Sequence, residues 1–192
     1  MIRCLITDGT FAHDPTRWMA HVARWIAEGV ELLQIRERDL TARELAEVTR
    51  QVLRISNPCG TKILVNDRAD VALACGADGV HLRDGSVEPA KFARQGFLVT
   101  VSCHAVEDIQ RTAGADYALL APIFKPLSKP DERPALGTEA LREFTRRSRT
   151  PVLALGGITQ ENARACIDAG AAGVAGISLY GGDPRQRLSL PL

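Results

Sequence analysis

Short runs of apolar, mostly β-branched residues alternate along the chain with segments of helical periodicity. The apolar runs predict eight strands, at Cys4–Thr7, Glu31–Ile35, Lys62–Val65, Gly79–Leu82, Leu98–Ser102, Tyr117–Ala121, Val152–Leu155 and Gly173–Ile177. The segments between them predict helices, at Thr16–Glu28, Thr41–Ile55, Ala69–Cys75, Glu88–Arg94, Val106–Ala113, Thr138–Arg147 and Gln160–Ala169. Most of the strand runs are apolar at consecutive positions, which is typical of parallel strands covered by helices on both faces.

Signals at the helix ends support these assignments. Thr41 with Glu44 predicts a capping box, and Thr159 with Asn162 predicts another helix start. Pro89 is expected in the first turn of its helix, where a missing N–H costs nothing. A glycine suited to a left-handed cap recurs between a helix and the next strand, at Gly29, Gly76, Gly114 and Gly170. This recurrence indicates one repeated βα unit.

The alternation predicts the α/β class and a compact (β/α)8 TIM barrel, with one domain over residues 1–192. An open doubly wound sheet is the alternative. The barrel is favoured because no G-x-G-x-x-G motif follows the first strand and polar residues recur after nearly every strand. Only Ser178–Leu192 follow the eighth strand, so we expect a truncated or nearly absent eighth helix. The first and seventh helices would then expose apolar flanks, which predicts a homo-oligomer.

Charge balance and cysteine usage limit the partners. The 192 residues carry 24 Lys and Arg against 23 Asp and Glu, a formal charge of +1, so we expect no nucleic-acid and no membrane partner. No apolar stretch reaches the roughly 18 residues of a membrane span, and no long apolar signal segment opens the chain. The five cysteines form no C-x-x-C pair, which predicts reduced thiols and a cytoplasmic location.

In a TIM barrel the reactive groups follow the carboxyl ends of the strands. Arg36 and Arg38 follow the second strand two positions apart, and we expect them on one side. Two guanidiniums on one side form a site for a phosphate or carboxylate. The alternative is a solvated strand exit, in which Glu37 and Asp39 neutralise the arginines.

Carboxylates follow the third and fourth strands. Asp67, beside Asn66, suits a hard cation held with waters and substrate phosphates, and Asp84 is the second candidate ligand. Alternatively, Asn66 or Asp67 caps the next helix, and Asp84 begins a turn before Gly85. His81, inside the fourth strand, is equally consistent with a hydrogen-bonded core residue.

The fifth and sixth strands lead into a candidate base and a long loop. Ser102 and His104 share a side, and a histidine at a barrel mouth moves protons near neutral pH. Cys103 points to the other side, which argues against a nucleophilic Cys103–His104 pair. The segment Pro122–Gly137 predicts a lid or binding loop, or alternatively a surface excursion.

The last two strands lead into Gly156-Gly157 and Ile177-Ser178. Glycine amides at a helix start form a phosphate cradle, and many barrels bind phosphate at these two loops. A tight turn is the alternative for each loop alone. Their joint placement favours phosphate binding.

From Leu5 to about Ser178 the chain resembles the thiamine phosphate synthase and thiazole tautomerase superfamily, a set of small TIM barrels. Five stretches in order carry the resemblance: Gln34–Arg38, Val65–Arg68, Gly76–Leu82, Ala121–Phe124 with Ser128 and Lys129, and Ala154–Ile158. The resemblance implies a transferase of thiamine biosynthesis. Such a synthase couples hydroxymethylpyrimidine diphosphate to thiazole phosphate and releases pyrophosphate.

The resemblance also implies a role for each matching residue. The groups expected to hold the diphosphate are Arg36, Arg38 (usually Lys in the family), Asn66, Ser102 and Lys129. Asp67 would bind Mg²⁺, and Asp84 is the candidate for the second aspartate. The remaining substrate contacts are expected from Gln34, Ser128, Gly156, Gly157, Ile177 and Ser178.

Some positions depart from the synthase pattern. Ser86 stands where the family has its second metal aspartate, and Pro126 replaces a loop threonine. Ser86 and His104 resemble instead the tautomerase branch, which isomerises a thiazole carboxylate phosphate with a histidine and no metal. A thiazole tautomerase that uses His104 without a cofactor is therefore the alternative enzyme. A non-catalytic thiazole-phosphate or thiamine-phosphate binder is a second alternative.

Overall fold

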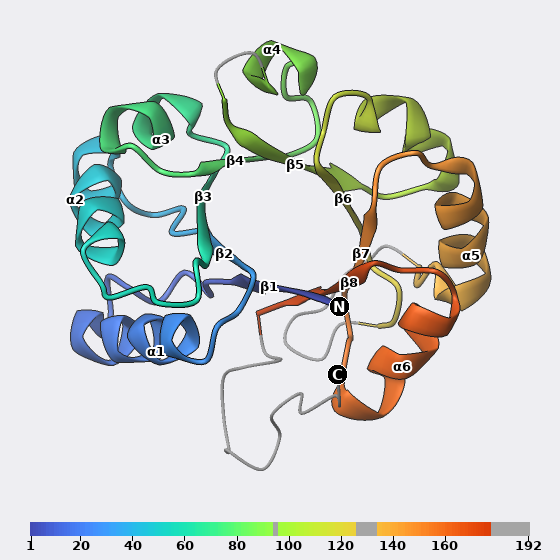
Figure 1. Ribbon diagram of the computed structural model, residues 1–192, viewed down its shortest axis with the longest axis horizontal. Coiled ribbons are helices and arrows are strands. Elements are labelled where there is room, and N and C mark those ends of the chain that lie inside the picture. The colour runs from blue at the N-terminus through green and yellow to red at the C-terminus, as the bar shows by residue number, and fades with distance from the viewer. Residues whose placement is uncertain (94–95, 126–133, 178–192) are drawn as a thin grey trace.

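The computed structural model describes residues 1–93, 96–125 and 134–177, and it shows a closed barrel of parallel strands (Figure 1). The strands are β1 (Ile2–Ile6), β2 (Leu32–Ile35), β3 (Lys62–Asn66), β4 (Gly79–Leu82), β5 (Leu98–Cys103), β6 (Tyr117–Leu120), β7 (Val152–Leu155) and β8 (Gly173–Gly176). Each strand pairs in parallel with the next, and β8 pairs with β1 to close the ring. The predicted TIM barrel is confirmed, and the open sheet is excluded.

Helices surround the barrel on the outside (Figure 1). They are α1 (Pro15–Ala27), α2 (Ala42–Leu53), α3 (Ala69–Cys75), α4 (Ala90–Ala93), α5 (Gly137–Arg147) and α6 (Gln160–Asp168), with the 3-10 segment η1 (Val106–Thr112) after β5. The prediction for the eighth helix falls on residues 178–192, which lie outside the described residues. None of the helices in the described ranges has the length and apolar character needed to span a bilayer.

The crossovers after β4 and β5 differ from the sequence prediction. Pro89 precedes α4 rather than opening it, and its carbonyl accepts the amide hydrogen of Phe92 at 2.9 Å. The segment after β5 is a 3-10 helix rather than an α-helix, a form common in short connections. The helical segments described there have four and seven residues, against thirteen in α1 and twelve in α2.

The predicted caps are confirmed. Thr41 and Glu44 form a reciprocal capping box at α2, and Thr159 and Asn162 form the equivalent contacts at α6. The four glycines at the helix ends all adopt positive φ: Gly29, Gly76, Gly114 and Gly170. The repeated turn therefore favours glycine, because a residue with a Cβ is strained in the left-handed backbone conformation.

Alternation along the strands divides the core into an interior and an outer layer. The barrel interior contains one apolar cluster, formed by Cys4, Ile6, Leu32, Leu119, Leu153 and Ala175. Two larger clusters pack between the strands and the surrounding helices. Near the carboxyl ends of the strands the buried residues become polar, including Gln34, His81 and Thr100. This polar layer forms the floor of the barrel mouth.

Candidate active site at the carboxyl ends of the strands

The floor of the mouth is a hydrogen-bonded layer on adjacent strands. The side-chain amide of Gln34 donates to Oδ1 of Asn66 at 3.2 Å. His81 contacts Thr100 Oγ1 through Nδ1 at 2.8 Å and Ser102 Oγ through Nε2 at 2.9 Å. Gln34 and Asn66, two of the predicted substrate contacts, are thus in direct contact. Ser102, a third, contacts His81.

His81 is a neutral, hydrogen-bonded core residue. Burial, together with the charges of Arg36 and His104, lowers the pKa of His81 from 6.5 to about 3. The neutral ring therefore orients Ser102 and does not exchange protons near pH 7.

The two arginines after β2 lie in different surroundings. Arg36 is half-buried, and burial with the neighbouring Arg38 charge lowers its pKa. Arg38 is exposed and lines a pocket of about 310 Å³ together with Asn66 and Asp67. The two guanidiniums therefore differ in exposure, and only that of Arg38 lines the pocket on this rim.

Glu37 holds the segment that carries these arginines. Its buried carboxylate accepts the indole N–H of Trp18 at 2.9 Å, the amide of Phe11 at 2.9 Å and the amide of Gly9 at 3.2 Å. Glu37 thus ties the end of β2 to the loop after β1. The sequence alternative was a solvated strand exit in which Glu37 and Asp39 neutralise the arginines. Glu37 is instead buried and holds the loop after β1.

The two candidate metal ligands have different partners. Asp67 accepts a hydrogen bond from Ser86 Oγ at 3.2 Å and pairs with Arg83 Nε at 2.6 Å. Asp84 forms an ion pair with Arg111. Within the described residues, no group of three His, Cys, Asp or Glu side chains forms a metal centre. Asp67, which directly follows β3, could hold Mg²⁺ in the mode where one carboxylate acts with substrate phosphates and waters.

β5 ends at the buried thiol of Cys103, and His104 follows it directly. His104 Nδ1 lies 2.9 Å from the carbonyl oxygen of Ala121, an acceptor, so Nδ1 carries the proton and Nε2 is the basic atom of the neutral ring. Burial and the nearby Asp108 raise the pKa of Cys103 to about 12, which keeps it a thiol. The protonated, buried state of Cys103 therefore argues against a Cys103 nucleophile.

The glycines after β7 permit a close backbone approach. Both have positive φ, and a Cβ on Gly157 would lie 2.5 Å from the carbonyl oxygen of Lys125. A Cβ on Gly156 would lie 2.7 Å from Cα of Pro122. The loop after β6 therefore packs directly on this turn, which continues into the cap of α6 through Asn162 and the Gly157 carbonyl.

Some predicted residues lie at or beyond the limits of the described chain. Ile177 directly follows β8 and packs on the interior cluster. Ser128, Lys129 and Ser178 lie outside the described residues. Arg83 is a rim residue that the sequence prediction left without a role, although its place directly after β4 was a usable signal.

Comparisons with known proteins identify the family of this chain. The family model described as thiamine monophosphate synthase matches residues 4–179. The chain belongs to the thiamine monophosphate synthase family. The resemblance inferred from the sequence is therefore confirmed.

Relatives of the family are similar over most of their length. The thiamine-phosphate synthase of Koribacter versatilis is 40% identical over 193 residues, covering 96% of this chain and 90% of that protein. The thiamine-phosphate synthase of Methanoregula boonei is 40% identical over 186 residues, covering 94% and 85%. The structure of thiamine phosphate pyrophosphorylase from Pyrococcus furiosus superposes with a TM-score of 0.81 at 27% identity, covering 95% and 88%.

Proposed function

We propose that the chain is a thiamine-phosphate synthase, a transferase that joins hydroxymethylpyrimidine diphosphate to thiazole phosphate. The observation that carries the proposal is the similarity to synthases at about 40% identity across nearly the whole chain. The cationic and amide groups after β2 and β3 support it because they follow neighbouring strands of one barrel rim.

The reaction needs an anionic leaving group to be stabilised. The thiazole ring nitrogen forms a bond to the pyrimidine methylene carbon while the carbon–oxygen bond to the diphosphate breaks. Pyrophosphate leaves with that electron pair, and the electron-rich aminopyrimidine carries the positive charge that develops. Arg36, Arg38, Asn66, Ser102 and Lys129 bind the diphosphate and stabilise its growing negative charge.

Asp67 is the proposed Mg²⁺ ligand. Magnesium, when bound, adds positive charge beside the departing pyrophosphate. The place of Asp67 beside Asn66 and Arg38 in the rim pocket supports this role, whereas Asp84 lies outside that pocket and pairs with Arg111.

Two further features fit the organic parts of the substrates. Oε1 of Gln34 is buried and accepts no hydrogen bond from the described residues, so an amino group of a ligand would satisfy it. The thiazole phosphate is assigned to the cradle of Gly156, Gly157, Ile177 and Ser178, with Ser128 beside the thiazole.

Purified protein tests the proposal directly. We expect formation of thiamine phosphate and pyrophosphate from the two substrates with Mg²⁺, and loss of this activity in Asp67→Asn. Full Mg²⁺-dependent turnover by Asp67→Asn would contradict the ligand role. Absence of turnover by the wild-type protein, with both substrates bound, would favour the non-catalytic binder.

Thiazole tautomerisation is a second candidate because His104 follows β5 at the barrel mouth and Ser86 stands where the synthase pattern has an aspartate. A tautomerase would isomerise the thiazole carboxylate phosphate without Mg²⁺. The change His104→Gln would then lower its rate by about 10²–10⁴, the usual contribution of a proton-transfer group. Metal-free isomerisation that depends on His104, without coupling, would replace the synthase proposal.

A cytoplasmic location and a homo-oligomer complete the proposal. The five cysteines are free in the structure, which supports a reducing compartment. Sedimentation velocity at micromolar concentration tests the oligomer, and a monomer would contradict it.

A further inference from the structure

Arg83 is a cation of the barrel rim that the roles assigned above leave unused. It follows β4 directly, and its Nε lies 2.6 Å from Oδ2 of Asp67. Its side chain is 66% exposed, whereas that of Asp67 is 27% exposed. An ion pair with one exposed partner contributes little net stability, so the guanidinium can exchange Asp67 for another anion.

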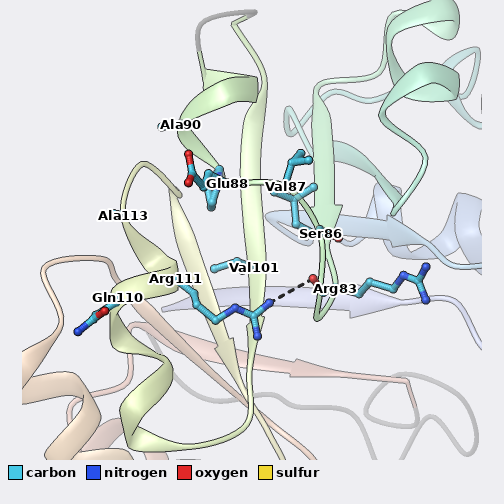
Figure 2. A pocket seen from close by; sticks show the side chains of 11 residues that line it. Arg83, Ser86, Val87, Glu88, Ala90, Val101, Gln110, Arg111 and Ala113 are labelled. Atoms are coloured by element: carbon cyan, nitrogen blue, oxygen red, sulfur yellow. Dashed lines mark hydrogen bonds between the residues drawn. The ribbon is translucent and has the colours of Figure 1, made fainter.

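Arg111 holds the backbone of Arg83, and the Arg83 side chain extends away from Arg111 toward Asp67. Arg111 donates to the carbonyl oxygen of Arg83 at 3.3 Å and pairs with the neighbouring Asp84. Figure 2 shows this hydrogen bond on one side of the loop and the Arg83 guanidinium extending away from Arg111. Arg111 therefore fixes the start of the loop after β4, and the Arg83 side chain reaches toward the end of β3.

The Arg83 side chain lines the pocket of about 310 Å³ that also contains Arg38, Asn66 and Asp67. A third arginine of this pocket, Arg68, is engaged by Asp70 at 2.6 and 2.8 Å. Arg38 and Arg83 thus flank the Asn66-Asp67 segment from two neighbouring loops. Glu37 also lines this pocket, but its carboxylate already accepts hydrogen bonds from Trp18, Phe11 and Gly9. The two guanidiniums beside the Asn66 amide and the Asp67 carboxylate suit an oligophosphate with several charged oxygens.

We propose that Arg83 is a further diphosphate-binding residue, held on Asp67 until the diphosphate arrives. This inference rests on the proposed function, because it extends the same diphosphate site. In the ligand-free protein the guanidinium neutralises Asp67, which otherwise repels an incoming polyanion. When the diphosphate binds, the Arg83 guanidinium donates to phosphate oxygens instead of to Asp67. The Asp67 carboxylate then no longer pairs with Arg83 and can bind the cation proposed above.

Titration with inorganic pyrophosphate in EDTA tests this role without metal or turnover. We expect Arg83→Gln to weaken pyrophosphate binding about tenfold and Arg83→Lys to weaken it less. Arg147→Gln is the matched control because Arg147 also forms an exposed ion pair, with Glu143 at 3.0 Å, at the opposite rim. We expect the control to bind within twofold of the wild-type protein. Thermal unfolding of each variant checks that the fold is retained.

A double-mutant cycle with Asp67 separates Arg83 binding from simple charge repulsion. In the wild-type protein and in Arg83→Gln alike, Asp67→Asn removes the repulsion between the Asp67 carboxylate and pyrophosphate. Only in the wild-type protein does it also release the Arg83 guanidinium from its ion pair. We therefore expect Asp67→Asn to tighten metal-free pyrophosphate binding more in the wild-type background than in Arg83→Gln. Equal tightening in both backgrounds, or folded Arg83→Gln that binds within twofold of wild type, would overturn the inference.

The two proposals fail in different ways. Wild-type protein that turns over both substrates while Arg83→Gln keeps its pyrophosphate affinity would overturn the role of Arg83 alone. Wild-type protein that makes no thiamine phosphate would overturn the proposed function, and the pyrophosphate titration would still decide whether Arg83 binds the anion. Wild-type protein that binds no pyrophosphate would overturn the inference about Arg83.

Discussion

Nε2 of His81 on β4 lies 2.9 Å from Oγ of Ser102 on β5, and the ring is buried beneath the barrel mouth. The imidazole is thus enclosed between two hydroxyl groups, because Thr100 contacts Nδ1 at 2.8 Å. A histidine in this setting acts through its hydrogen bonds and its neutrality.

The lowered pKa of His81 predicts a loss of stability in acid. The folded-state pKa is about 3 against 6.5 for an unperturbed histidine, so below pH 6.5 the unfolded chain binds a proton that the folded protein does not. The free energy of unfolding should therefore fall by up to about 1.4 kcal/mol per pH unit as the pH drops from 6.5 toward 3.

Urea unfolding at pH 7 and pH 5 measures this effect. His81→Gln removes the titrating group and keeps a hydrogen-bonding side chain, so its stability should depend less on pH than that of the wild-type protein. The carboxylates are common to both proteins, which isolates the contribution of His81. Identical pH dependence in the two proteins would rule out a buried, neutral His81.

Arg36 is expected to be required for coupling. Arg36 is half-buried, and its removal takes from the diphosphate one of its proposed charged donors, in a setting that water screens less than the exposed Arg38. We expect Arg36→Gln to lower kcat/KM by about 10²-fold or more, measured as pyrophosphate release. Arg43→Gln is the control because Arg43 is exposed and pairs with Glu47 on α2. Equal kcat/KM values for the two variants would count against the role of Arg36.

Gly157 is expected to tolerate no side chain. An alanine Cβ would lie 2.5 Å from the Lys125 carbonyl oxygen in addition to adopting φ +61. Gly76→Ala is the control because it has φ +72 with open space around the Cβ, so it carries only the left-handed cost of about 1–2 kcal/mol. We expect Gly157→Ala to lose a further 1–3 kcal/mol or so. Urea unfolding of both variants compares these losses, and equal losses would contradict the close packing.

Glu37 is expected to stabilise the rim rather than to react. Glu37→Ala leaves the Trp18 indole N–H and the Phe11 and Gly9 amides without their acceptor. Each buried donor without a partner costs about 1–3 kcal/mol, so we expect a loss near 3 kcal/mol in urea unfolding. Glu37→Gln keeps one acceptor and should lose less. A loss below about 0.5 kcal/mol for Glu37→Ala would show that water replaces the carboxylate.

The sequence by itself determined the elements and the fold. Gly79–Leu82 and Val152–Leu155 are strands with the predicted bounds, and the Thr41 capping box forms as predicted. These features depend on residues only a few positions apart, through side-chain alternation, helical periodicity and capping. The order of polar residues after the strands also identified the rim, because parallel strands in a closed barrel end on one side.

Only the tertiary structure decided which polar side chains meet on that rim. The contacts of Asp67 with Arg83 and Ser86, and of His81 with Thr100 and Ser102, join neighbouring strands or the loops that follow them. Their partners are set by strand register, loop path and rotamer, none of which a local pattern encodes. For the same reason Asp67 and Asp84, equivalent by position in the sequence, pair with different arginines in the folded protein.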